Sequence, residues 1–153
     1  MKKTMISLVP INAENEMECI DLKPKEDQMN LVASNADSLM HAKKEITSKP
    51  HGIYVDDCMV GFLLFDNEVY TDGYYWILRF MIDHRFQGKG YGKSAILEVI
   101  EILRRKNDCK EIRVSHVSSN IVANSVYKSC GFEETGEYEE CGDPILRYRV
   151  IKS

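Results

Sequence analysis

A nearly continuous apolar segment, followed by a glycine-rich loop, constrains the fold of this chain more than any other feature. Residues 75–82 read YWILRFMI, a pattern that predicts a central strand buried on both faces. The next residues, DHRFQGKGYGK at 83–93, hold three glycines within five positions. Apolar residues then recur at helical spacing at Ile96, Val99 and Leu103. The chain therefore joins a buried strand to an amphipathic helix through a glycine loop.

This loop has the properties of an anion-binding site. Glycines allow positive φ angles and close approach of a ligand to the backbone, and the free N–H groups at a helix start point toward negative charge. Arg85, Lys89 and Lys93 add positive charge to the same segment. We therefore expect a ligand that carries phosphates.

Three phosphate-binding patterns compete for the loop. The P-loop pattern G-x-x-x-x-G-K-[ST] ends correctly at residues 92–94 but requires glycine where Gln87 stands. A dinucleotide pattern can begin at Gly90, but no acidic residue stands at the end of the next predicted strand, residues 112–117. The third pattern, Q/R-x-x-G-x-G/A, is met in full by Gln87, Gly90 and Gly92.

A second motif follows the loop. Residues 120–132 fit N-x-x-A-x-x-x-Y-x-x-x-G-F, with Asn120 at a predicted helix start and Tyr127 two turns further along the same side. Together with the third loop pattern, this motif resembles the GNAT superfamily of N-acetyltransferases. The run WILRFMIDHRFQGKGYG at residues 76–92 is also similar to the bacterial spermine/spermidine, or diamine, acetyltransferase branch.

The resemblance implies a fold for the whole chain, as one acetyltransferase domain over residues 1–153. The fold is of the α/β (α+β) class, with a mixed, mostly antiparallel central sheet of about six to seven strands and helices on both faces. The two central parallel strands splay apart in such a fold.

The residue pattern itself predicts the element order β-α-α-β-β-β-α-β-α-β-β. Expected strands outside the central region are at residues 4–10, 52–55, 59–65 and 112–117, with a final hairpin at 132–139 and 145–151. Residues 27–46 are expected to form two short helices broken at Asn35. The helix after the glycine loop should end near Asn107, with Glu101 paired to Arg105.

The resemblance further implies acetyl-CoA as co-substrate and no metal. In such enzymes the central strand pairs with the pantetheine arm, and a backbone N–H polarises the thioester carbonyl. The residues that it assigns to acetyl-CoA lie on the strand, in the loop and at the second helix start, and they are Phe80, Met81, Ile82, Gln87, Gly88, Lys89, Gly90, Tyr91, Gly92, Lys93 and Asn120.

Catalysis by direct attack of an amine on the thioester needs a proton donor and a proton acceptor. A departing thiol titrates at about 8.5 and a tyrosine at about 10, so Tyr127 is the expected general acid. The sequence leaves the base open among His116, Asp83 and His84. In some members of the polyamine branch an acidic residue stands where this chain has Leu78.

The expected acceptor is a small polyamine such as spermidine or spermine. Its ammonium groups would be bound by Asp27, Asp37 and Glu45 on the early helices, with Glu137 and Glu139 of the late hairpin as alternates. The other acids of that hairpin, including Asp143, are interpreted as a solvated surface, and Arg79 as a surface or cleft charge. A protein N-terminus, an aminoglycoside or an amino acid remain alternative acceptors, and a non-catalytic acyl-CoA sensor or a nucleotide-binding module are alternative functions.

Composition narrows the protein class. The chain has 153 residues, of which 44% are hydrophobic and 29% charged, with no apolar run long enough for a membrane helix. Its net charge of -4 and the absence of a continuous Lys and Arg stripe argue against nucleic-acid binding. Five widely spaced cysteines without a CxxC pair indicate reduced thiols and a cytoplasmic location. A homodimer is left open.

Overall fold

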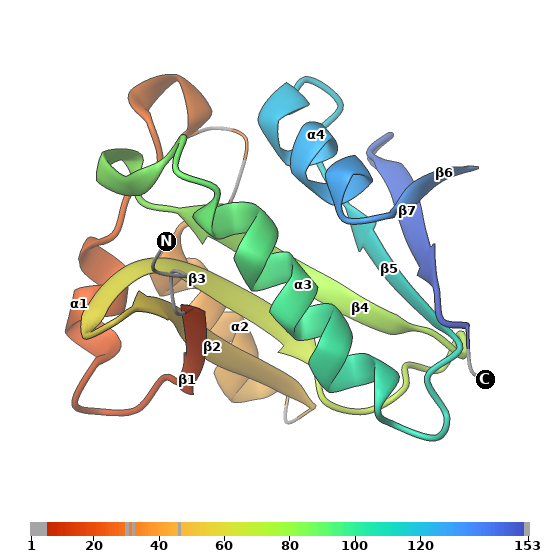
Figure 1. Cartoon of the computed structure of the whole chain (residues 1–153), viewed down its shortest axis with the longest axis horizontal. Coiled ribbons are helices and arrows are strands. Elements are labelled where there is room, and N and C mark those ends of the chain that lie inside the picture. Colours follow the sequence, from red (N-terminus) through yellow and green to blue (C-terminus); the bar gives the residue numbers. More distant parts are fainter. Residues whose placement is uncertain (1–5, 30, 32, 46, 152–153) are drawn as a thin grey trace, which may run out of the picture.

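The computed structural model describes residues 6–29, 31, 33–45 and 47–151. Its strands are β1 (Ile6–Pro10), β2 (Ser48–Val55), β3 (Cys58–Asp66), β4 (Tyr75–Ile82), β5 (Glu111–Ser115), β6 (Glu133–Tyr138) and β7 (Pro144–Arg149). Its α-helices are α1 (Glu16–Asp21), α2 (Asn35–Lys44), α3 (Tyr91–Arg104) and α4 (Ile121–Ser129), and 3₁₀ turns form η1 (Glu26–Gln28) and η2 (His84–Phe86). This order confirms the predicted succession of strands and α-helices (Figure 1).

The seven strands form a single sheet in the order β1-β2-β3-β4-β5-β7-β6. Every neighbouring pair is antiparallel except β4 and β5, which run parallel. Helices α3 and α4 lie on one face of the sheet, and α1 and α2 lie on the other (Figure 1). The mixed, mostly antiparallel sheet that the resemblance implied is therefore confirmed, with β4 in its middle.

Strand β3 carries the hydrophobic cores of both faces. Its side chains alternate across the sheet because successive residues of a strand point to opposite faces. Leu63 and Phe65 pack into the core under α3 and α4, whereas Phe62 and Leu64 pack into the core under α1 and α2. Nearly every residue of β3 is buried, so it is a more completely buried strand than β4.

Strands β4 and β5 pair along only part of their length. Their register covers Tyr75–Ile77 against Ile112–Val114, although β4 continues to Ile82. On its other side β4 has a β-bulge at Leu78, because Phe65 pairs with Ile77 and Leu64 pairs with Arg79. A bulge bends the strand that carries it. The two parallel strands therefore separate, and Leu78, Arg79 and Phe80 are only half-buried, which corrects the prediction that β4 is buried throughout.

Two other predictions need correction. Asn35 is not a helix break; it is the first residue of α2, and Ser34 caps that helix by accepting a hydrogen bond from the Asp37 N–H at 3.1 Å. Helix α3 ends at Arg104, and Glu101 pairs with Arg104 at 2.9 Å in place of Arg105. Positions 4 and 5 of the predicted first strand, and 30, 32 and 46 of the predicted early helices, lie outside the described residues.

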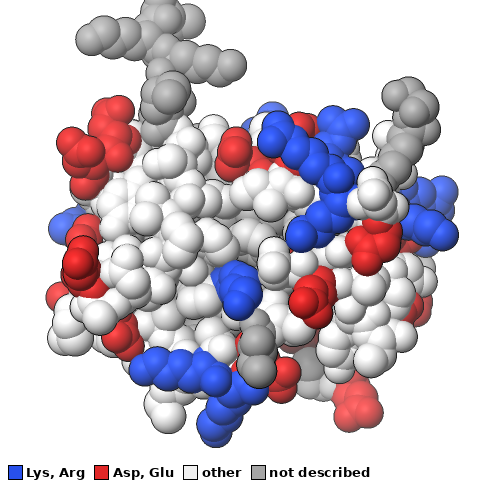
Figure 2. Space-filling view, turned by 90° about the horizontal axis from the view of Figure 1, so that it is seen from below, with Lys and Arg blue, Asp and Glu red and all other residues white. Residues whose placement is uncertain are grey.

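Figure 2 shows how charged side chains are distributed on one face of the molecule. Acidic and basic side chains are scattered there around a largely uncharged area, and Lys and Arg gather toward the C-terminal end of the chain without forming a continuous stripe among the residues drawn in colour. Within the described part of the chain, no helix has both the length and the apolar character needed to cross a bilayer.

The close approach of β3 and β4 predicts a large effect of one substitution. A Cβ atom at Gly61 would lie 2.5 Å from the backbone oxygen of Met81, so Gly61→Ala must push the two strands apart. We expect it to lower the free energy of unfolding by about 1–3 kcal/mol, measured by urea denaturation. Gly52→Ala is the matched control, because its Cβ would meet only movable side-chain ends of Tyr54 and Met59 at 2.9 and 3.0 Å. Equal losses in the two variants would contradict this account of the strand contact.

Candidate active site

Asp83 fixes the start of the glycine loop directly after β4. Its buried carboxylate accepts hydrogen bonds from the Lys23 N–H at 3.0 Å, the Arg85 N–H at 3.0 Å and the Arg85 Nε at 2.8 Å. Burial alone would raise the pKa of the Asp83 carboxyl, but these hydrogen bonds outweigh it and hold the pKa below its usual value. Asp83 is therefore a charged anchor whose oxygens are already occupied.

The glycine loop presents free backbone N–H groups to one side. Gly88 and Gly90 have φ angles of +80° and +83°, and Gly90 caps α3. The Ser94 N–H donates to the Gly90 carbonyl at 3.2 Å, which is the first hydrogen bond of α3. The N–H groups of residues 91–93 therefore have no carbonyl partner within the helix. A helix start of this kind attracts anions.

Gln87 ties the loop to two other segments. Its side-chain amide donates to the Ile82 carbonyl and to the Gln28 Oε1, both at 2.9 Å, and accepts from the Gln28 Nε2 at 3.3 Å. Gln28 belongs to η1, which lies 59 residues away in sequence. This reciprocal amide pair was not predicted, because no local pattern links the two positions.

A pocket of about 370 Å³ opens beside these N–H groups, and we name it the loop pocket. It is lined by Pro24, Lys25, Gln28, Phe80, Met81, Ile82, Phe86, Gln87, Gly88, Gly90, Tyr91, Gly92, Lys93, Asn120, Val122, Ala123 and Val126. Every residue predicted to bind acetyl-CoA lies here except Lys89, which is exposed and not part of the lining. The structure thus brings the loop, the end of β4 and the start of α4 together.

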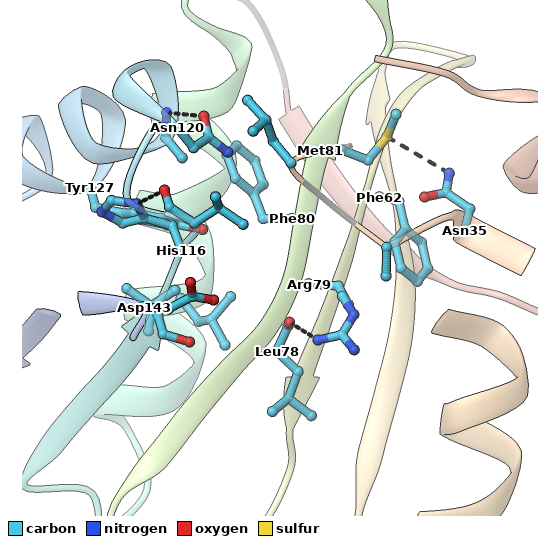
Figure 3. A pocket seen from close by; sticks show the side chains of 17 residues that line it. Asn35, Phe62, Leu78, Arg79, Phe80, Met81, His116, Asn120, Tyr127 and Asp143 are labelled. Carbon is cyan, nitrogen blue, oxygen red and sulfur yellow. Dashed lines mark hydrogen bonds between the residues drawn. The ribbon is translucent and has the colours of Figure 1, made fainter. Parts of the chain in front are cut away.

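A second pocket, the central pocket, has a volume of about 360 Å³ and lies where β4 and β5 separate (Figure 3). It is lined by Leu31, Ala33, Asn35, Phe62, Ile77, Leu78, Arg79, Phe80, Met81, Val114, Ser115, His116, Val117, Asn120, Ala123, Tyr127 and Asp143. Phe80, Met81, Asn120 and Ala123 line both pockets, so the two lie side by side and share this seam.

Tyr127 faces the central pocket from α4. Asn120 sets the start of that helix by accepting a hydrogen bond from the Ala123 N–H at 3.1 Å, which confirms its predicted role as a cap. The Tyr127 ring is buried against Phe80 and Phe132, with ring centroids 6.0 and 5.6 Å away. Burial raises the pKa of its hydroxyl, and the nearby Cys130 thiol adds to the effect. Tyr127 therefore stays protonated near neutral pH and can donate a proton.

Only one of the three candidate bases lines a pocket, and it is His116. Its Nδ1 lies 2.7 Å from the Val117 carbonyl, and its Nε2 lies 3.0 Å from the Asn124 side-chain amide. Because a carbonyl only accepts, Nδ1 carries a proton, and Nε2 faces the Asn124 amide. His84 is exposed and lines neither pocket.

The sequence pattern of the Acetyltransferase (GNAT) family matches residues 16–132, which is most of the chain. The chain belongs to the GNAT family of acetyltransferases. Its co-substrate is acetyl-CoA, and it is an N-acetyltransferase, as the two sequence motifs indicated. Among the described residues, no group of three or more His, Cys, Asp or Glu side chains could hold a metal ion.

Known proteins similar to this acetyltransferase include a spermine/spermidine N(1)-acetyltransferase from Bacillus subtilis strain 168. It is 31% identical over 146 residues, which cover 92% of this chain and 96% of the relative. The crystal structure of a Vibrio cholerae spermidine N-acetyltransferase in complex with CoA and spermine superposes with a TM-score of 0.74 at 15% identity, covering 95% of each chain. An aminoglycoside acetyltransferase in complex with coenzyme A gives a TM-score of 0.78 at 16% identity, again over 95% of each chain. The two structural likenesses show the fold.

The acids predicted to bind the acceptor are not brought to the pockets of this acetyltransferase. Asp27, Asp37 and Glu45 are exposed and line neither pocket. Of α2, only the first residue, Asn35, reaches the central pocket. Of the alternates on the late hairpin, Glu137 pairs with Arg113 at 3.1 Å. Glu139 lines neither pocket.

One charged residue of the central pocket was missed, and a second was left open between the surface and the cleft. Asp143 was interpreted as solvated hairpin surface, yet it is the acidic residue that lines this pocket in the described chain. Arg79 points into the same pocket from β4 (Figure 3). The position of Asp143 depends on how the β6–β7 hairpin folds back against α4 and β5, and no local sequence signal reports that arrangement.

The glycine loop gives a test with a closely matched control. Gly90→Asp places a negative charge beside the free N–H groups at the start of α3, and we expect the dissociation constant for coenzyme A to rise at least about tenfold by calorimetry. Gly136→Asp is the control, because Gly90 and Gly136 share positive φ angles of +83° and +79° and open space around the Cβ position. The control carries the same backbone strain away from both pockets, so it should bind coenzyme A normally. Normal binding by folded Gly90→Asp would show that the loop does not hold the phosphates.

Proposed function

We propose that this enzyme acetylates a primary amine of a small polyamine, such as spermidine or spermine, by direct attack on acetyl-CoA. The observation that carries the proposal is the 31% identity, over 92% of the chain, to a relative named for that activity. The size of the central pocket supports it, since about 360 Å³ suits a small flexible amine better than a folded protein segment.

The loop pocket holds acetyl-CoA in this proposal. The pyrophosphate lies against the N–H groups of Gly88 to Lys93, with the Lys93 ammonium adding positive charge at the pocket wall. Gly92 lets α3 approach β4, because a Cβ there would lie only 3.1 Å from the Phe80 ring. The backbone of residues 80–82 extends past the β4–β5 pairing, so its groups on that side are available to the pantetheine arm, apart from the Ile82 carbonyl that Gln87 occupies.

The acetyl group is transferred at the seam between the two pockets. Bound acetyl-CoA supplies an activated thioester carbonyl, and a backbone N–H of β4 polarises its oxygen. The neutral amine nitrogen bonds to the carbonyl carbon while the carbon–sulfur bond breaks. Burial keeps the Tyr127 hydroxyl protonated until the thiolate departs. Tyr127 then donates its proton to that thiolate, and the resulting tyrosinate takes up a proton from solvent after product release. His116 is the candidate base that accepts the proton of the amine. Its Nε2 must first release the hydrogen bond to the Asn124 side-chain amide.

The role of Tyr127 is tested by removing only its hydroxyl. We expect Tyr127→Phe to keep the affinity for acetyl-CoA and to lower kcat by about 10² or more, because the thiolate loses its proton donor. Tyr75→Phe is the control, since both tyrosines are buried but the Tyr75 hydroxyl donates to Asp108 at 2.6 Å outside both pockets. An unchanged kcat in Tyr127→Phe, with chemistry rate-limiting, would remove this residue from the mechanism.

The acceptor class is tested by thiol release at saturating acetyl-CoA across spermidine, spermine, an aminoglycoside and a peptide amine. We expect the highest kcat/KM for the two polyamines, with a spermidine KM that rises with salt because ionic contacts are screened. Rapid turnover of the aminoglycoside or the peptide, with both polyamines inert at millimolar concentration, would refute the substrate and leave the acetyltransferase activity standing.

A further inference from the structure

The central pocket carries two opposite charges that are not paired with each other. The Asp143 carboxylate forms no hydrogen bond or ion pair within the part of the chain that the structure describes; only its backbone oxygen is used, by the Glu139 N–H at 2.8 Å. Arg79 donates from Nη1 to the Leu78 carbonyl at 2.7 Å, and its buried Nε lacks any partner among the described residues. The Asp143 carboxylate is therefore available to a ligand, and no salt bridge within the described residues offsets the charge of Arg79.

The two charges lie on different sides of the opening between β4 and β5. Figure 3 shows Asp143 on the side of His116 and Tyr127, whereas Arg79 extends from β4 toward the side of Phe62 and Asn35. A cation in this pocket is attracted to the first side and repelled from the second. The two sides of the central pocket thus carry opposite charges, so a ligand with an ammonium group is favoured in one orientation.

We propose that Asp143 binds the second, non-reacting ammonium of the acceptor, and that Arg79 repels cations from the other side. This inference rests on the proposed polyamine function and gives the acceptor one orientation. A carboxylate beside the reacting nitrogen would favour its protonated form and oppose attack, since an opposite charge within a few ångströms stabilises the charged state. The second ammonium stays charged throughout the reaction, so its pairing with Asp143 does not oppose the chemistry.

Arg79 acts as a specificity residue in this arrangement. A guanidinium remains protonated at any pH that the enzyme meets, so its repulsion of an ammonium is permanent. With Arg79 on one side and Asp143 on the other, the charged remainder of the acceptor lies toward the turn between β6 and β7. Amines with a second positive charge a few carbons from the reacting nitrogen are therefore preferred over simple alkylamines of equal length.

The test compares 1,4-diaminobutane with butylamine, which share one carbon chain and differ in the second ammonium. The measured quantity is the ratio of their kcat/KM values at saturating acetyl-CoA. For the unmodified enzyme we expect a ratio of about ten or more in favour of the diamine, the scale of one charge-assisted hydrogen bond. Asp143→Asn should bring the ratio close to one. Glu140→Gln, which removes the same charge from the same turn outside the pocket, should keep it.

A second variant tests the repulsion. Arg79→Gln should raise the ratio further, by about threefold at low ionic strength, and added salt should reduce that gain.

A ratio that stays unchanged in folded Asp143→Asn overturns the inference. If both amines then lose kcat/KM in proportion, Asp143 lies at the reacting nitrogen instead. A lower ratio in Arg79→Gln overturns the role of Arg79. A preference for diamines that survives in Asp143→Asn leaves the proposed polyamine function standing, whereas inert diamines with every variant would refute that function itself.

Discussion

The short pairing between β4 and β5 is the constraint on which the rest of the structure depends. Three residues of each strand are matched, and beyond them the bulge at Leu78 bends β4 while β5 ends at Ser115. Parallel strands that stop pairing leave backbone groups without partners, and such groups need water or a ligand. The opening therefore provides both the space of the central pocket and the unpaired strand edge beside the loop pocket. Without this opening, β4 and β5 would pair along their whole length, and the helices on the two faces would cover an uninterrupted sheet.

Rigid anchors hold the glycine loop beside this opening. Asp83 ties the loop start to the backbone of Lys23, and Gln87 bonds both to Ile82 and to Gln28. These contacts are buried or half-buried, so they fix the loop in one position relative to β4. A loop that is already ordered loses less conformational entropy when its ligand binds. The glycines supply the backbone shape, and the anchors determine where that shape is placed.

The parts of the site that follow from local chemistry were predictable from sequence, and the parts that follow from tertiary packing were not. The loop before α3, the Asn120 cap and the order of elements each depend on neighbouring residues, and each matches the structure. Asp143 reaches its pocket through the folding of the β6–β7 hairpin, and Arg79 lies next to the bulge in β4. Gln28 reaches its pocket through a contact that spans 59 residues. The sequence shows which residues of the early helices are acidic, and these were therefore expected near the acceptor. The sequence does not show in which direction α2 runs relative to the pocket. Charge in a sequence thus indicates what a protein attracts more readily than where it binds.

The walls of the two pockets come from different parts of the chain. The loop pocket is built largely from one continuous stretch, Phe80 to Lys93, whereas the central pocket takes single side chains from separate elements, including Asp143 at the outer hairpin. That hairpin lies at one end of the sheet, and none of its residues lines the loop pocket. In the proposed arrangement, the turn of this hairpin can change in length or charge without altering the pocket assigned to the acetyl donor. In evolutionary terms, an enzyme arranged in this way can exchange one amine for another through a few residues of a surface turn while the donor side stays the same.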